Sequence, residues 1–390
     1  MKKAFLFIYL FISSQFIFAQ QNLLSDQAEI SVLTIAPGSS LNDAFGHNAF
    51  RIKDPSINLD KTFDYGRFDF EAPNFYLNFA RGKLNYSIGD STFYDFLRFY
   101  IYQNRTVKEQ VLNLSQSEKQ TLYNYLLENN KPENKDYLYD FFFDNCATKI
   151  KDVVNITLNN TIDFKAPKDF KQETFRSLIQ NNLNRNSWGS LGIDVALGSV
   201  IDRKATPEEH MFLPEHIHKF FEVATIKNEN QLIKESKVLY QQKETVKSSS
   251  FLTSPLFVFW GIAILILFIT FNDYKKNKRT KWLDVVLFSI TGIIGILILL
   301  LWFATDHKGT HQNYNLLWAF VLNILVVGQL FKKEVNPWFV KYIKLLVILL
   351  CLLALHWIIG VQVFAIGLLP FLLALLIRYI YLIKIFSRRH

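Results

Sequence analysis

Residues 141–152 read FFFDNCATKIKD, an aromatic run followed by the start of an amphipathic helix. Asp144 and Asn145 are residue types that favour the position just before a helix. The apolar residues that follow recur at helical spacing, at Ala147, Ile150, Val153 and Val154. This pattern predicts Cys146 in the first turn of a helix, where free backbone N–H groups and the helix dipole stabilise a thiolate.

The cysteine count makes this position informative, because the chain has only Cys146 and Cys351. Cys351 lies in the apolar run VILLCLLAL, which we expect to be inside a membrane, so it cannot pair with Cys146. An unpaired exported cysteine is a buried thiol, a partner in an intermolecular disulfide, or a nucleophile. The position at a helix start favours the nucleophile.

A thiolate that turns over acyl groups needs a base within hydrogen-bonding reach and a third group to orient that base. His47 lies in AFGHNAFRI (44–52), a predicted strand, beside Gly46, whose missing side chain lets another chain or a substrate approach. A second strand is predicted over TFDYGRFDF (62–70). His47 is therefore the first candidate for the base.

The other histidines are weaker candidates. HMFLPEHIHKFF (210–221) contains His210, His216 and His218, but it has neither companion cysteines nor the spacing of a zinc protease, so no metal site is expected. His307 and His311 lie in a short loop between two apolar runs, on the predicted side of Cys146. That loop, 304–318, is predicted to be part of the active site, with a solvated turn as the alternative.

Residues 20–225 are predicted to form one exported domain, and 226–250 a polar connector, helical or loose. Within the domain, 115–130 is predicted to be a helix that opens with a capping box of Ser115 and Glu118. Residues 137–143 (YLYDFFF) fit either a buried strand or aperiodic core.

The ends of the chain indicate export and membrane insertion. Residues 1–19 combine Lys2 and Lys3, a short apolar run and a small Ala19, as in a cleavable signal peptide; an uncleaved anchor is the alternative. Residues 251–390 are predicted to form an all-α membrane domain. Its five expected spans lie near 254–271, 282–304, 314–331, 340–359 and 362–383.

Charge gives the orientation of these spans. From Phe251 onward there are 14 Lys or Arg and 4 Asp or Glu, whereas residues 20–250 have 27 basic and 30 acidic residues. The formal net charge of +9 therefore comes from the membrane half, where basic residues indicate the topology of the spans. No nucleic-acid partner is expected. The basic connections 273–281 and 331–337 and the tail are predicted to be cytoplasmic, which leaves residues 20–250 outside.

Seven stretches, in this order, resemble the Lnb-type lipoprotein N-acyltransferase family, and they cover nearly the whole mature chain. They are FGHNAFRI (45–52), FDYGRFDF (63–70), ARGKLNY (80–86), QNRTVKEQVLNLS (103–115), FFFDNCATKIKD (141–152), LGIDVALGSVIDRKATPEEHMFLPEHI (191–217) and THQNYNLLW (310–318). The resemblance implies an α+β, permuted papain-like domain of the NlpC and lecithin:retinol acyltransferase kind, followed by the membrane domain.

Carried over onto these stretches, the resemblance implies that Cys146 is the nucleophile and His47 the general base. Asp64 is the candidate orienting group at a place where the family pattern leads one to expect Asn, and Tyr65 is its rival. The remaining candidates for substrate binding are Tyr65, Asn145, Arg105, His307, His311 and Asn315.

The implied reaction moves an acyl chain from a phospholipid, through a Cys146 thioester, to the N-terminal amine of a diacylated lipoprotein. It needs neither a metal nor a cofactor, and it takes place on the periplasmic side of the bacterial cytoplasmic membrane. Two alternatives remain open: a membrane-anchored NlpC-like peptidase or amidase acting on cell-wall peptide, and a non-enzymatic scaffold that binds lipoproteins.

Overall fold

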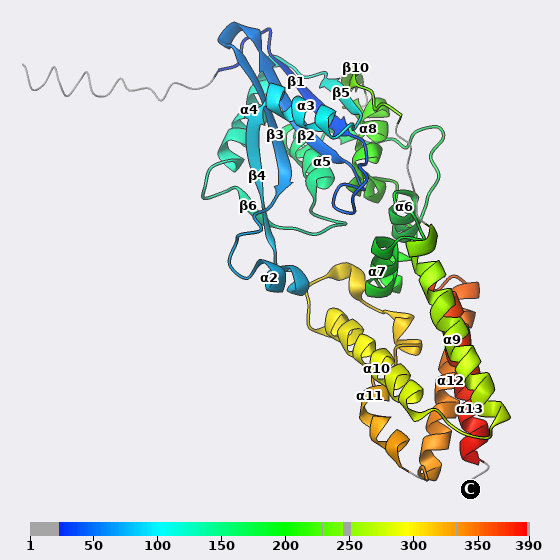
Figure 1. The fold of residues 1–390 in the computed structure, drawn as a ribbon. Coiled ribbons are helices and arrows are strands. Elements are labelled where there is room, and N and C mark those ends of the chain that lie inside the picture. Colours follow the sequence, from blue (N-terminus) through cyan, green and yellow to red (C-terminus); the bar gives the residue numbers. More distant parts are fainter. Residues whose placement is uncertain (1–22, 228, 245–250, 333, 388–390) are drawn as a thin grey trace, which may run out of the picture.

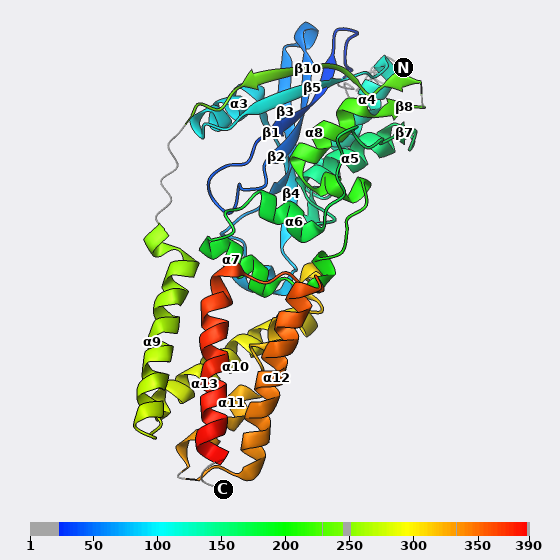
Figure 2. The same cartoon turned by 90° about the vertical axis from the view of Figure 1, so that its right-hand side faces the viewer.

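The computed structural model describes residues 23–227, 229–244, 251–332 and 334–387 (Figure 1). The predicted signal peptide, residues 1–19, lies outside the described residues. An α/β domain built on one large sheet lies at one end of a bundle of apolar helices (Figures 1 and 2). An exported domain followed by a helical membrane domain is therefore what the chain folds into.

The large sheet has seven strands in the order β10-β5-β1-β2-β3-β4-β6, and every neighbouring pair is antiparallel. The strands are β1 (Glu29–Ile35), β2 (His47–Asp54), β3 (Leu59–Arg67), β4 (Asn85–Thr92), β5 (Val107–Leu112), β6 (Asp136–Leu138) and β10 (Ile233–Tyr240). A second sheet contains the short strands β7 (Ile162–Asp163), β8 (Thr225–Ile226) and β9 (Asn230–Gln231).

Successive side chains of a strand point to opposite faces of the sheet, and both faces of this sheet are apolar. Phe50 and Ile52 of β2 pack with residues of α4 (Gln116–Asn129), α5 (Cys146–Thr157) and α8 (Pro214–Val223). Ala49 faces the other way and packs against α3 (Phe93–Tyr102). Figure 2 shows α3 on one side of the sheet and α5 and α8 on the other. The first residue of α5 is thereby held against the middle strands.

Several predicted elements are confirmed. Cys146 is the first residue of α5, and the capping box of Ser115 and Glu118 opens α4. The two predicted strands correspond to β2 and β3, each displaced by a few residues. Of the run 137–143, only its first two residues belong to β6. The rest forms a turn in which Asp140 and Asp144 pair with each other.

The connector predicted over 226–250 is wrong for its first half. Residues Ile233–Tyr240 form β10, which pairs with β5 as the edge strand of the large sheet. Most of its side chains are exposed, and charged residues on an edge strand protect that edge against pairing with other chains. The polar composition that suggested a connector is therefore the composition of an edge strand.

Among the residues that the structure describes, four helices are long and apolar enough to span a membrane. They are α9 (Pro255–Lys275), α10 (Lys281–Phe303), α12 (Pro337–Ile358) and α13 (Leu369–Ser387). The basic connections lie together at the end far from the sheet (Figure 1), where Arg279 donates to the Leu330 carbonyl and Tyr381 to the Lys278 carbonyl. This arrangement agrees with the topology predicted from charge.

The segment 314–331 is not one continuous helix, although its length and apolarity predicted a fifth span. It folds into η7 (Tyr314–Leu317), α11 (Asn323–Val326) and η8 (Val327–Phe331). Asn323 donates to Thr291 at 2.8 Å and accepts from Tyr342 at 2.6 Å. Broken helices are tolerated at membrane depth where protein groups satisfy the freed polar atoms, and neighbouring helices do so here.

Glycines of α10 explain how closely this broken segment packs. A Cβ at Gly295 would lie 2.1 Å from the Ala319 carbonyl oxygen, and one at Gly292 would lie 2.7 Å from the Ile324 nitrogen. Small residues at such contacts let two backbones approach closely in a membrane. The 314–331 segment is thus an integral part of the bundle.

Candidate active site

The capping residue before Cys146 fixes the start of α5. Asn145 Oδ1 accepts hydrogen bonds from the N–H groups of Ala147 and Thr148, at 2.8 and 3.0 Å. Its amide donates to the carbonyls of Phe141 and Phe212. All the polar groups of this buried side chain are therefore used within the protein. Asn145, predicted to bind substrate, uses its side chain to fix the start of α5.

Cys146 and His47 face each other across the end of β2. The thiol is hydrogen-bonded to the His47 side chain and to the backbone N–H of Asn48. His47 follows Gly46, which has a φ of +83° and packs so close to β1 that a Cβ would lie 2.6 Å from the Ile35 carbonyl oxygen. The glycine beside His47 therefore serves a close approach between strands, as predicted.

Asp64 of β3, the predicted third group, lies beside His47. Nε2 of His47 lies 3.1 Å from Asp64 Oδ2, which leaves Nδ1 as the ring nitrogen available to Cys146. The structure thus brings together the three residues predicted to be catalytic. Tyr65, the rival to Asp64, points to the opposite face of the sheet, where it is buried and donates to Asn129 at 2.5 Å.

Arg67 is a site residue that the sequence analysis missed. Its guanidinium donates to Asp64 Oδ1 through Nε at 2.9 Å and through Nη2 at 2.5 Å. Room for this side chain comes from Gly89 of β4, where a Cβ would lie 2.5 Å from Arg67 Nη1. The charge that Asp64 adds relative to an asparagine is therefore balanced by an arginine three residues later.

Gly66 lies between these residues at an irregularity in the pairing of β3 with β4. Its φ of +94° is a conformation that favours glycine. A Cβ at this position would lie 3.7 Å from Cys146 Cβ and 4.0 Å from His47 Cε1. The missing side chain keeps the space beside the thiol free.

The electrostatics of the site favour a thiolate–imidazolium pair. Burial raises the pKa of the Cys146 thiol, but the His47 charge and hydrogen bonds outweigh burial, so that the net pKa is lowered. Burial lowers the pKa of His47, yet Tyr100, Cys146 and Asp64 raise it well above its ordinary value. Asp64 stays ionised because His47 and Arg67 overcome its burial and lower its pKa.

Arg105 lies at the edge of this cluster. It is buried, its Nε donates to the Ala36 carbonyl at 2.8 Å, and its guanidinium carbon is 5.0 Å from the Tyr100 ring centroid. Its Nη2 has no hydrogen-bond partner among the described residues. The pKa of Arg105 is lowered by burial, and a nearby Cys146 thiolate opposes that effect. Arg105 is therefore a cationic donor beside Tyr100, near enough to Cys146 to interact with its charge.

The predicted site residues of the 304–318 loop lie elsewhere, at the junction of the two domains. His307 Nε2 is 2.9 Å from the Phe79 carbonyl oxygen. The buried Asn315 donates to the Asp194 carbonyl at 3.0 Å, and its Oδ1 accepts from Trp318 at 2.8 Å. At His311 it is the backbone that packs against Gly198. These contacts join the loop to the exported domain, where Lys308 also lies 3.7 Å from Asp140 in the turn that precedes Cys146.

The three histidines of 210–221 form no metal centre among the residues that the structure describes. His210 is fully buried, and both ring nitrogens are used: Nδ1 is 2.8 Å from the Thr206 carbonyl oxygen, and Nε2 accepts from the Glu173 N–H at 3.1 Å. His216 lies beside His210 in an edge-to-face ring contact. The cluster is part of the packing of α8.

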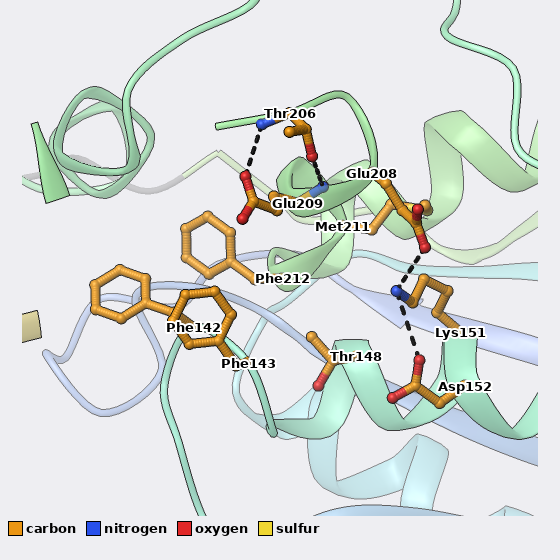
Figure 3. A pocket seen from close by; sticks show the side chains of 10 residues that line it. All are labelled: Phe142, Phe143, Thr148, Lys151, Asp152, Thr206, Glu208, Glu209, Met211 and Phe212. Carbon is orange, nitrogen blue, oxygen red and sulfur yellow. Dashed lines mark hydrogen bonds and ion pairs between the residues drawn. The ribbon is translucent and has the colours of Figure 1, made fainter. Parts of the chain in front are cut away.

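A pocket of about 200 Å³ opens one turn along α5 from Cys146, but neither Cys146 nor His47 lines it. Figure 3 shows the rings of Phe142, Phe143 and Phe212 gathered on one side of it. On the other side Lys151 lies between Glu208 and Asp152, at 2.9 and 3.5 Å. The cation of this pocket is thus already paired with two carboxylates.

Comparisons with known proteins agree with the geometry. The model of the Lnb N-terminal periplasmic domain matches residues 17–181, and that of the Lnb transmembrane domain matches residues 246–390. No curated protein and no solved structure matches the chain. The first match contains His47, Asp64 and Cys146, and the second contains the whole bundle. The chain therefore carries both domains of the Lnb family in their order, and it belongs to that family.

Proposed function

We propose that this protein is a lipoprotein N-acyltransferase of the bacterial cytoplasmic membrane that works through a thioester on Cys146. The observation that carries the proposal is the Cys146–His47–Asp64 arrangement on a domain attached to membrane helices. A cysteine at a helix start, paired with a histidine that a carboxylate orients, is the arrangement of a covalent acyl-transfer site. Membership of the Lnb family supports this reaction.

In the first half-reaction, the Cys146 thiolate attacks the carbonyl carbon of a phospholipid ester. The tetrahedral intermediate collapses with cleavage of the ester C–O bond, and the His47 imidazolium gives its proton to the departing lysophospholipid oxygen. Asp64 holds the ring so that Nδ1 stays directed toward the sulfur. The product is an acyl thioester on Cys146.

In the second half-reaction, the α-amine of a diacylglyceryl-cysteine lipoprotein attacks the thioester carbonyl. His47, now neutral, takes a proton from the attacking amine, and the C–S bond breaks to regenerate the thiolate. The products are an amide and the starting ion pair. Because both half-reactions use one histidine and one sulfur, the kinetics are expected to be ping-pong.

The oxyanion donors differ from a simple helix-start arrangement. The N–H groups of Ala147 and Thr148 are taken by Asn145, so they are not free to bind a developing oxyanion. None of the hydrogen bonds within the described residues uses the Cys146 N–H. We infer that this N–H is one donor and that the buried Nη2 of Arg105 is the second.

The order of the site residues along the chain supports a permuted papain-like arrangement. His47 and Asp64 come from consecutive antiparallel strands, and Cys146 follows at the start of a helix packed on them. Both substrates of the proposed reaction lie in the outer leaflet. A domain attached closely to its spans can meet them without their full extraction into water.

Intact-mass analysis of lipoprotein N-terminal peptides tests the proposal. Cells with the protein are expected to yield peptides heavier by one acyl chain than those from cells lacking it, and the Cys146→Ser protein should not restore this mass. Unchanged peptide masses, together with altered cell-wall peptides, would favour the peptidase alternative. Unchanged masses with lipoproteins in the wrong place would favour the scaffold.

A further inference from the structure

The connection between β3 and β4 exposes an unusual concentration of aromatic side chains. We call residues 68–79, which include most of α2 (Phe75–Arg81), the aromatic segment. Tyr76 is 77% exposed, and the other large apolar side chains exposed here are Phe68, Phe70, Leu77 and Phe79. Exposed apolar patches of this kind mark surfaces that contact a protein or a membrane.

The aromatic segment has its own small core, so its exposed side chains are held on a defined surface. Phe75 is buried, and its ring centroid lies 5.0 Å from that of Phe70 and 5.9 Å from that of Phe68. Gly82, with a φ of +70°, ends α2 and turns the chain back toward β4. The exposure of Tyr76 and Leu77 is therefore built into the fold.

Contacts with the membrane domain place the aromatic segment at the bilayer surface. The span α10 ends at Phe303, and three residues later the N–H of Asp306 donates to the Arg81 carbonyl at 2.9 Å. His307 meets the Phe79 carbonyl at the same distance. Figure 1 shows α2 at the membrane-facing end of the exported domain, beside the segment that follows α10. Aromatic side chains are enriched at this level of a bilayer.

A row of aromatic rings leads from the segment to the thiol. Phe68 lies 5.2 Å from Tyr86, and Tyr86 stacks on Tyr139 at 4.1 Å between ring centroids. Tyr139 directly precedes the Asp140–Asp144 bridge that closes the turn leading to Cys146. The chain itself makes the same connection, because the segment follows directly after Asp64, Gly66 and Arg67 of β3.

We propose that the aromatic segment inserts into the outer leaflet and passes phospholipid acyl chains along Phe68, Tyr86 and Tyr139 to Cys146. The occupant of this surface is thus membrane lipid, because the contacts of Arg81 and Phe79 with the end of a span fix it at that level. The passage of acyl chains rests on the function proposed above. Insertion of the segment does not.

Helix α3 offers a matched control surface. Tyr94 is 69% exposed, close to the value for Tyr76, and Phe99 and Tyr102 are also exposed. Figures 1 and 2 show α3 on the face of the sheet, away from the helical bundle. The two surfaces expose similar aromatic side chains but lie at different heights above the helical bundle. A difference between them therefore comes from position and not from composition.

Nitroxide labels on the full-length protein in phosphatidylethanolamine and phosphatidylglycerol vesicles test insertion. Tyr76→Cys and Tyr94→Cys are each introduced into a Cys146→Ser, Cys351→Ala background, so that only one thiol is labelled. The label at position 76 is expected to collide with oxygen and be shielded from a water-soluble nickel chelate, and the label at 94 to show the reverse. Equal access of the chelate to both labels would overturn the proposal.

A second experiment tests delivery with the native cysteines in place. Tyr76→Asp with Leu77→Asp is expected to slow acyl transfer from vesicle phospholipid at least tenfold, whereas Tyr94→Asp leaves it within twofold. Unchanged alkylation of Cys146 by iodoacetamide shows that the site is folded. Unchanged transfer in the double variant would overturn delivery. If the intact protein transfers no acyl chain, the proposed function fails, and the depth of the label still decides insertion.

Discussion

An arginine–aspartate cluster in the membrane bundle can be compared with one in the exported domain, and only the second is combined with a reactive pair. In the membrane bundle, Arg378 donates to Asp284 at 2.7 Å and to Asp273 at 2.8 Å. In the exported domain, Arg67 takes one oxygen of Asp64 and leaves the other to His47. The first cluster joins three helices, whereas the second ends on an imidazole beside a thiol.

The comparison shows how similar residues serve two purposes. Arg378 is fully buried and its partners come from the ends of α9 and α10, so the cluster closes the end of the bundle far from the sheet. Arg67 is more than a third exposed, and its contribution to stability is small at such a place. Its effect is on the charge of Asp64, and through Asp64 on the orientation and charge of His47.

The largest effect is expected from Cys146→Ser, which should abolish acyl transfer while the protein remains abundant and inserted. A serine hydroxyl is close in size to the thiol but does not ionise to a nucleophile at neutral pH. Two quantities are measured: acyl transfer to lipoprotein peptides, and the abundance of the protein in the membrane. Cys351→Ser is the matched control. A Cys146→Ser protein that retains full activity would remove covalent catalysis from the mechanism.

His47→Ala is expected to slow transfer by roughly 10²-fold to 10⁴-fold, the usual loss for a general base. It should also change the pH dependence of Cys146 alkylation. His47 lowers the pKa of the thiol, so removing it raises that pKa and moves the midpoint of the alkylation rate to higher pH. An unchanged midpoint would show that His47 does not act on the thiol.

Arg378→Met and Arg67→Met sharpen the comparison between the clusters. Arg378→Met removes the closest cation from Asp273 and Asp284, and breaking a buried pair costs about 3–5 kcal/mol, so abundance and thermal stability should fall. Arg67→Met should leave abundance almost unchanged. Because Arg67 lowers the pKa of Asp64, its loss raises that pKa. When the pH is lowered, the variant should therefore lose acyl transfer at a higher pH than the unsubstituted protein does. Equal losses of abundance in the two variants would erase the distinction.

The smallest effect is expected at the domain junction. Asn315→Ala leaves the buried Trp318 indole N–H and the Asp194 carbonyl without their partner. An unsatisfied buried polar group costs about 1–3 kcal/mol, so thermal stability should fall and transfer should fall with abundance. His311→Ala is the control from the same loop. Lost transfer at full abundance in Asn315→Ala would return this residue to the substrate site.

Local patterns predicted the parts of the site that depend on local structure. A cap before an amphipathic run predicted the helix start at Cys146, and an aromatic strand beside a glycine predicted the place of His47. The basic connections likewise predicted one end of the bundle. Each of these signals lies within a few residues, so it can be found without knowing which segments meet.

The features that the sequence analysis missed depend on contacts between distant segments. Arg67 reaches Asp64 only because Gly89 of another strand leaves room for it, and Gly66 matters through residues 47 and 146. The edge strand β10 lacks an alternating apolar pattern because its successive side chains from Lys234 to Val238 are all exposed. Asn315 had the composition of a binding loop, and its partners in α7 (Trp188–Ala196) lie more than one hundred residues away.

The thioester itself provides the most direct test of the mechanism. Purified full-length protein is incubated with vesicles of a phospholipid with one defined acyl chain and no acceptor, then digested for peptide mass analysis. We expect the peptide containing Cys146 to gain the mass of that acyl chain and to lose it to neutral hydroxylamine or to a diacylated lipoprotein peptide. An N-acylated acceptor formed while Cys146 never gains an acyl group would contradict the mechanism.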